Sequence, residues 1–132
     1  MIDHTGIIVA DIQRSRAFFE AALAPIGYRL LAEIPAAVTQ STDVAGFGEP
    51  PKPDFWISGA TAARPVNHPP LHVAFRVKTR AEVDAFYHAA LAAGGRDNGA
   101  PGPRMHYHPN YYGAFVLDPD GHNIEAVCHE PV

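Results

Sequence analysis

One short stretch occurs twice in this chain of 132 residues, first as FFEAAL and then as FYHAAL. The copies begin at Phe18 and Phe86, so they lie 86 − 18 = 68 positions apart. Other identical pairs share that offset: His4 and His72, Val9 and Val77, Leu23 and Leu91, Gly27 and Gly95, and Pro51 and Pro119. Chance readily explains one echo but hardly so many matches at one offset. The repeat therefore predicts two related modules, about 1–59 and 70–129.

The two modules are expected to share one hydrophobic core. Each has about the size at which a separate core becomes marginal. The joining segment ATAARPVNHPP is rich in proline and should be irregular. Hydrophobic residues make up 47% of the chain, which is enough to close a core. We therefore predict a single domain over residues 1–132.

Each module is predicted to have the element order β-α-β-β-β, an α+β fold. The segments HTGIIV and LHVAFRV are rich in β-branched and aromatic residues and should form the first strand of each module. A helix follows each strand, with Asp11 as the first N-cap and Thr79 with Glu82 as a capping box. Further strands are expected at 28–34, 37–44, 54–58, 111–118 and 122–128, with a last one around 104–108. The sequence DPDG at 118–121 is typical of a hairpin turn.

Charge and composition exclude several classes of partner. The formal net charge is −4 and no run of Lys and Arg occurs, so no nucleic acid is expected to bind. No apolar run approaches the roughly 20 residues that cross a bilayer, so no membrane association is expected. Cys128 is the only cysteine and cannot form an internal disulfide. With no export signal recognisable, we expect a cytoplasmic protein.

Two histidines and one glutamate are candidate metal ligands. Side chains alternate along a strand, so His4 and His72 should lie opposite the bulky face on which the helices pack. Their equivalence in the repeat predicts that a pseudo-twofold axis brings them together. Glu125 sits between Ile124 and Ala126, where an unpaired charge is costly to bury. Taken singly, each residue is more often structural or solvated; taken together, they indicate a metal site.

At these residues the chain resembles the vicinal oxygen chelate superfamily, also called the glyoxalase/bleomycin-resistance/dioxygenase superfamily. The resemblance rests on DHTGIIVADIQRSRAFFEAAL, LHVAFRV and, above all, YYGAFVLDPDGHNIEAV. It implies paired βαβββ modules that form a curled mixed sheet around a metal-binding cleft. It also implies that His4, His72 and Glu125 match the family's ligand positions for a divalent ion such as Fe, Mn, Ni, Co or Zn.

The chain departs from the family at the fourth ligand, which members often supply from the last strand of the first module. The repeat offset points to 125 − 68 = 57, which is Ile57, and its side chain cannot bind a metal. The neighbouring Phe55, Trp56 and Ser58 supply no histidine or carboxylate either. This departure weakens a direct assignment as glyoxalase I. Trp56 and Phe55 are expected either to form an apolar wall of the cleft or to pack in the core.

The segment RMHYHPNYYG gathers histidines and tyrosines before the strand that leads to the DPDG turn. His108 is the candidate catalytic acid or base in this segment. The alternative is a polar loop of stacked aromatic rings. Two other histidines, His88 and His122, are expected at the surface. Cys128 should be a small buried side chain.

The resemblance implies a metal-dependent, glyoxalase-like enzyme of the lyase or isomerase type, acting on a small oxygen-rich substrate. Two alternatives remain open. One is a ring-cleaving Fe(II) dioxygenase, and the other is a non-catalytic small-molecule binding protein of the drug-resistance type. Family members pair their modules within one chain or across two, and we expect a homodimer here.

Overall fold

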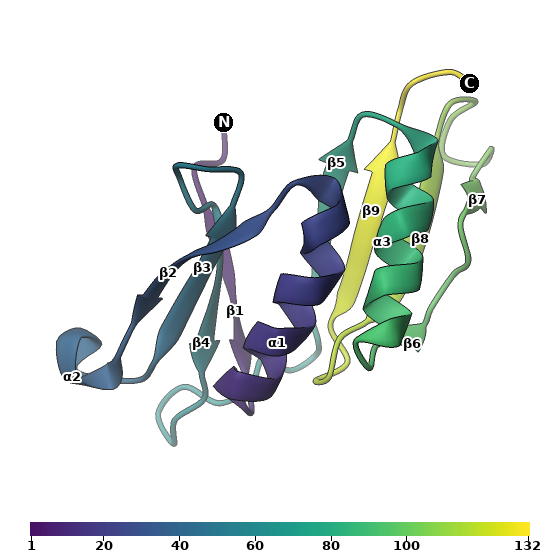
Figure 1. Cartoon of the computed structure of the whole chain (residues 1–132). Coiled ribbons are helices and arrows are strands. Elements are labelled where there is room, and N and C mark those ends of the chain that lie inside the picture. Colours follow the sequence, from purple (N-terminus) through teal and green to yellow (C-terminus); the bar gives the residue numbers. More distant parts are fainter.

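A computed structural model describes all residues 1–132 and contains two modules of the same design (Figure 1). The first comprises β1 (Thr5–Val9), α1 (Ile12–Leu23), the 3₁₀ turn η1 (Ala24–Ile26), β2 (Arg29–Ile34), α2 (Ala36–Thr39), β3 (Val44–Gly48) and β4 (Phe55–Gly59). The second comprises β5 (His72–Val77), α3 (Arg80–Ala92), β6 (Arg96–Asp97), β7 (Gly102–Pro103), β8 (Tyr112–Leu117) and β9 (Asn123–Cys128). The predicted pair of similar modules and the α+β class are confirmed.

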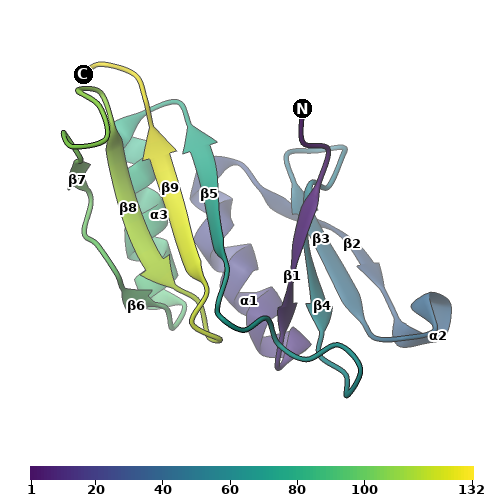
Figure 2. The same ribbon diagram turned by 180° about the vertical axis from the view of Figure 1, so that it is seen from behind.

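Each module has its own sheet. The strand order is β1-β4-β3-β2 in the first and β5-β9-β8-β6 in the second, where β7 also pairs with β8. The pairs β1–β4 and β5–β9 are parallel, and the remaining pairs are antiparallel. The sheets do not close into one curled sheet, because β1 and β5 are unpaired along their outer edges. Figure 2 shows the sheet faces opposite α1 and α3, with both long helices behind them.

Both predicted helix starts are confirmed. The Asp11 side chain accepts a hydrogen bond from the Arg14 N–H at 3.1 Å. Thr79 and Glu82 form the reciprocal capping box, in which each side chain accepts from the other residue's backbone N–H. These bonds satisfy amide donors that have no partner within the helix. None of the helices is long and apolar enough to cross a bilayer.

A single cluster of 20 buried apolar residues extends through both modules. The helices lie side by side and cover one face of each sheet (Figure 1). The ring of Phe55 on β4 lies 5.1 Å from that of Phe19 on α1 and 5.3 Å from that of Phe75 on β5, measured between centroids. Phe55 therefore joins the aromatic packing of one module to that of the other.

The free edge of β1 is held at its carboxyl end by polar groups from the second module and the linker. The Ile8 N–H donates to Asn67 Oδ1 at 2.7 Å, and the Ile8 carbonyl accepts from His122 Nε2 at 3.2 Å. On the other side of its ring, His122 Nδ1 accepts from the Leu71 N–H at 2.9 Å. The prediction that His122 is exposed is wrong, because its ring is 0% exposed and satisfies these otherwise unpaired backbone groups.

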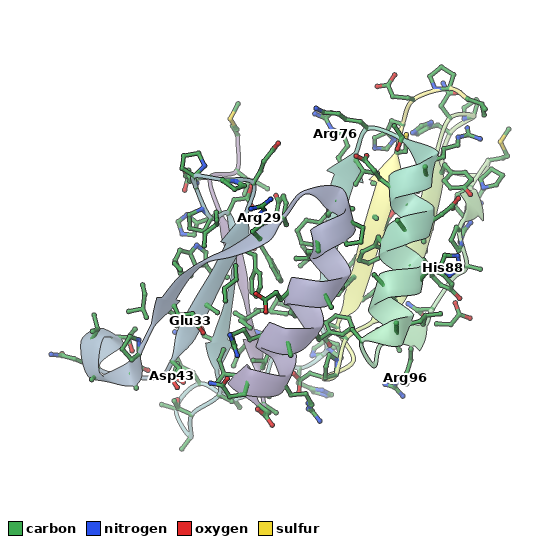
Figure 3. All side chains as sticks on the ribbon, viewed as in Figure 1. Arg29, Glu33, Asp43, Arg76, His88 and Arg96 are labelled. Atoms are coloured by element: carbon green, nitrogen blue, oxygen red, sulfur yellow. The ribbon has the colours of Figure 1, made fainter.

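Two predicted strands are also wrong. The segment 37–44 begins as the short helix α2, and its strand starts only at Val44. Asp43 lies beside α2 (Figure 3), and its side chain accepts a hydrogen bond from the Ala36 N–H at 2.7 Å. This bond stabilises a helical turn where the β-branched residues had predicted a strand. The segment 104–108 is a loop. The strand expected there is replaced by two short strands that lie earlier in the chain, β6 and β7. His88 on α3 is exposed, as predicted (Figure 3).

Candidate metal centre

The uncovered face of the second sheet carries a histidine–glutamate pair. The β5–β9 register places Ala74 beside Glu125, one pleat from His72. His72 Nε2 donates to Glu125 Oε1 at 2.9 Å. The glutamate is only 1% exposed, whereas half of the His72 side chain is open to solvent. Two of the three predicted ligands therefore lie together on the open face.

Tyr111 completes the surroundings of this glutamate. Its hydroxyl donates to Oε2, the carboxylate oxygen that His72 leaves free. Burial and this bond to Glu125 raise the pKa of Tyr111 above its ordinary value, so the phenol keeps its proton and acts as a donor. A methyl group at Gly113 would come within 3.1 Å of the Tyr111 ring and 3.3 Å of Oε2. A residue without a side chain at position 113 therefore allows this close approach.

His108, the predicted acid or base, lies beside Tyr111 rather than beside the pair. Its Nδ1 accepts from the Asn110 N–H at 3.1 Å, so Nε2 carries the proton and donates to His129 Nδ1 at 2.8 Å. The His108 and Tyr111 ring centroids are 5.4 Å apart. The aromatic segment pointed to this region of the fold, but the residue that contacts Glu125 is Tyr111. An acid–base role for His108 stays a prediction.

His4 does not join the pair within one chain. It lies just before β1, where its Nδ1 bonds Asp3 Oδ1 at 2.7 Å, and it is exposed. It lines a cavity of about 350 Å³ on the first sheet together with Trp56. No group of three or more His, Cys, Asp or Glu side chains in the chain is placed to hold a metal ion. The predicted convergence of all three ligands is therefore not found in a single chain.

The position that corresponds to Glu125 in the first module is Trp56, not Ile57. Ala74 pairs with Glu125 in the second sheet, and its repeat equivalent, Gly6, pairs with Trp56 in the first. The repeat offset in the last strand is thus 125 − 56 = 69. The first module has one residue fewer after Pro51 than the second module has after Pro119. Ile57 is 0% exposed and faces the helix-packed core. A glutamate introduced there would be buried among apolar groups instead of providing a fourth ligand.

The geometry of the pair suits a divalent ion. Two ligand atoms that each lie about 2.1 Å from an ion, at right angles about it, are about 3 Å apart. The separation of 2.9 Å between His72 Nε2 and Glu125 Oε1 has this size. An imidazole nitrogen and a carboxylate oxygen bind Fe, Mn, Ni, Co and Zn. A metal bound here would take the place of this hydrogen bond between the two side chains.

Comparison with known proteins agrees with this fold. The family model described as "Glyoxalase/Bleomycin resistance protein/Dioxygenase superfamily" matches residues 1–126. A glyoxalase/bleomycin resistance protein from Albidiferax ferrireducens T118 is 26% identical, with 98% of each chain covered and a TM-score of 0.76. A family enzyme from Burkholderia phytofirmans PsJN is 21% identical, with 98% of each chain covered and a TM-score of 0.70.

An E144Q mutant of glyoxalase I from Zea mays is 22% identical, with a TM-score of 0.71. The match covers 96% of this chain but 46% of the maize chain, so this chain spans slightly less than half of that protein. Comparison with curated protein sequences gives no significant match.

Proposed function

Because the chain belongs to the glyoxalase/bleomycin resistance protein/dioxygenase superfamily, we propose that it is a metal-dependent enzyme of the glyoxalase type. The proposed reaction is a lyase or isomerase step on a small oxygen-rich substrate. One observation carries this proposal: Glu125 is buried on a sheet face that no helix covers, with His72 on one oxygen and Tyr111 on the other. A proposed cytoplasmic location accords with a single, buried cysteine.

Each residue of this group has a separate task. His72 and Glu125 would hold the ion, and the bound ion would polarise substrate oxygens as a Lewis acid. Tyr111 keeps Oε2 engaged, which fixes the plane of the carboxylate and presents Oε1 on the His72 side. Partners that orient a metal ligand in this way commonly decide its affinity.

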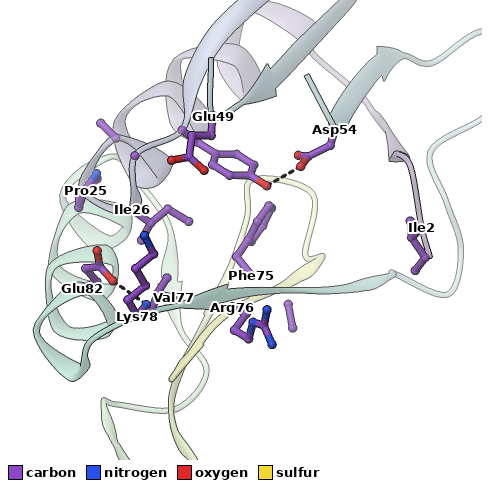
Figure 4. Close-up of a pocket in the computed structure, with 14 residues that line it drawn as sticks. Ile2, Pro25, Ile26, Glu49, Asp54, Phe75, Arg76, Val77, Lys78 and Glu82 are labelled. Atoms are coloured by element: carbon purple, nitrogen blue, oxygen red, sulfur yellow. Dashed lines mark hydrogen bonds between the residues drawn. The ribbon is translucent and has the colours of Figure 1, made fainter. Parts of the chain in front are cut away.

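The third ligand in this proposal is His4 of a second copy, so the active form is a homodimer. Cavities follow the whole free edge of β5. One of about 340 Å³ lies between residues 72–75 and first-module residues of the same chain, among them Asp3 and Thr5, and one of about 1140 Å³ lies between residues 74–78 and 24–28. Figure 4 shows the larger cavity, with Phe75 and Arg76 projecting from opposite sides of β5. An unpaired strand beside such a space can accept a segment of another chain.

A change of Tyr111 to phenylalanine is expected to weaken metal binding by about 10- to 100-fold, the usual cost of losing a group that orients a ligand. The ring stays, but Glu125 Oε2 loses its donor. Isothermal titration with Zn²⁺ and Ni²⁺ at one pH measures the effect. Tyr112→Phe is the matched control, because the Tyr112 hydroxyl donates to Asp84 on the helix side of the strand. Equal losses in both variants would show that Tyr111 does not position the carboxylate.

Metal analysis of protein purified without a histidine tag tests the proposed function. After incubation with Fe, Mn, Ni, Co and Zn, we expect about one equivalent of metal per chain. Less than about one tenth of an equivalent would favour a small-molecule binding protein without metal chemistry. Selective retention of Fe(II) would instead favour the ring-cleaving alternative, for which His72, Glu125 and a partner's histidine form the usual two-His, one-carboxylate set.

A further inference from the structure

Trp56, the only tryptophan in the chain, lies on the uncovered face of the first sheet. A methyl group built at Gly46 would lie 2.8–2.9 Å from three adjacent atoms of the six-membered indole ring. Nearly equal distances to adjacent atoms place that point above the ring and not at its edge. The indole therefore rests flat on the backbone at Gly46. The side chain is only half-buried, which leaves its other face available.

A cavity of about 350 Å³ lies against this tryptophan. Seven residues line it: His4, Thr5, Gly6, Val44, Trp56, Ser58 and Arg64. None of them is a carboxylate, and Arg64 is the only one with a permanent charge. The Arg64 guanidinium forms no ion pair and no hydrogen bond, since only the backbone N–H and carbonyl of this residue are engaged, both with Thr61. The cavity thus combines a flat aromatic surface with an unpaired cation and two hydroxyls.

We propose that this cavity binds a planar aromatic group that carries a carboxylate or a similar anion. The ring stacks on the indole of Trp56, and Arg64 pairs with the anion. A saturated ring has no π face and can contact the indole only through its C–H groups, and a neutral ring leaves the guanidinium unpaired. The cavity therefore selects for both features.

The assignment of this group to the enzyme's substrate rests on the proposed function. His4 lines the same cavity as Trp56, and both belong to the first sheet. If His4 approaches a pair of His72 and Glu125, in the same chain or in another copy, the cavity formed by Trp56 and Arg64 lies next to that pair as well. The proposed substrate thus has adjacent oxygens for the ion at one end and a planar anionic portion at the other.

The experiment uses three probes on metal-free protein in excess chelator: benzoate, cyclohexanecarboxylate and benzyl alcohol. The indole N–H resonance of the single tryptophan reports binding in ¹⁵N-correlation spectra. Benzoate is expected to shift this resonance saturably, with an affinity about two- to tenfold higher than either other probe. Equal affinities for benzoate and cyclohexanecarboxylate, or no shift with benzoate at millimolar concentrations, would overturn the proposal.

Variants separate the two contacts, with benzoate binding followed by saturation transfer to the ligand. Trp56→Leu should weaken binding about two- to tenfold, and Trp56→Phe, which keeps a flat ring, should restore much of it. Arg64→Gln should weaken benzoate two- to fivefold without affecting benzyl alcohol. Arg96→Gln, an exposed arginine on β6, is the matched control and should change nothing. Undiminished benzoate binding by both Trp56→Leu and Arg64→Gln would contradict the proposal.

These experiments contain no metal, so their failure and the failure of the metal centre are distinguishable. A protein that binds metal but not benzoate would keep the proposed function and lose this substrate class. A protein that binds benzoate but no metal would keep the aromatic site and become a small-molecule binding protein.

Discussion

Glu125→Gln is expected to weaken the binding of Zn²⁺, Ni²⁺, Co²⁺ and Mn²⁺ by more than about 100-fold. Losing a group that orients a ligand costs about 10- to 100-fold, and losing the charged ligand itself should cost more. Glutamine keeps the shape of the side chain, and its amide oxygen can still accept from Tyr111. The loss would therefore report the missing negative charge and not a cavity in the sheet.

Competition against a fluorescent chelator measures this affinity, with circular dichroism to show that the variant is folded. Glu20→Gln is the control, because Glu20 is exposed on α1 and remote from β9. If Glu125→Gln binds as tightly as the unchanged protein, Glu125 is a structural residue and the metal centre lies elsewhere.

Phe55→Ala is expected to lower the free energy of unfolding by about 3–5 kcal/mol, the usual cost of truncating a buried phenylalanine. Phe55 is 1% exposed and packs against Phe19 in its own module and Phe75 in the other. Because the two modules share this packing, unfolding in urea should remain a single transition, now at lower urea concentration.

Met105→Ala is the control for this measurement. Met105 is 64% exposed, and surface changes of this kind usually stay within about 0.5 kcal/mol. Two separate transitions, one for each module, would contradict the prediction that residues 1–132 form one domain. A loss of less than about 1 kcal/mol in Phe55→Ala would show that the shared packing contributes little.

Much of the fold could be predicted because the repeat and the local signals agree. The capping box of Thr79 and Glu82 depends on neighbours in sequence, and this prediction is confirmed. The prediction of a strand at 37–44 is wrong because Asp43, which is not β-branched, accepts a hydrogen bond from the backbone of a helical turn. Such a competing bond leaves no periodic signal.

The site could be predicted in part. His72 and Glu125 meet because adjacent parallel strands fix their spacing. A constant repeat offset could not identify Trp56 as the equivalent of Glu125. One residue missing from a turn moves every later side chain in the strand to the other face of the sheet. Tyr111 stands outside any strand, and its contact with Glu125 depends on how the preceding loop folds back. Only the structure shows which of the aromatic residues in that loop reaches the carboxylate.

The central claim is that His72 and Glu125 of one chain and His4 of another bind one ion. Mixed dimers test it most directly, with two metal-free affinity tags to isolate each pair. The first dimer joins a His4→Ala chain to a Glu125→Gln chain. The second joins an unchanged chain to a chain that carries both substitutions. Metal per dimer is then measured at concentrations where neither variant homodimer binds tightly.

If the site is shared between chains, the two mixed dimers should differ in metal content. In the first dimer, the intact His4 of one chain meets the intact His72 and Glu125 of the other, so about one ion should bind. In the second dimer, each site has one defective half, so no ion should bind tightly. The reverse result, with metal in the second dimer and none in the first, would place the whole site within one chain and contradict the account.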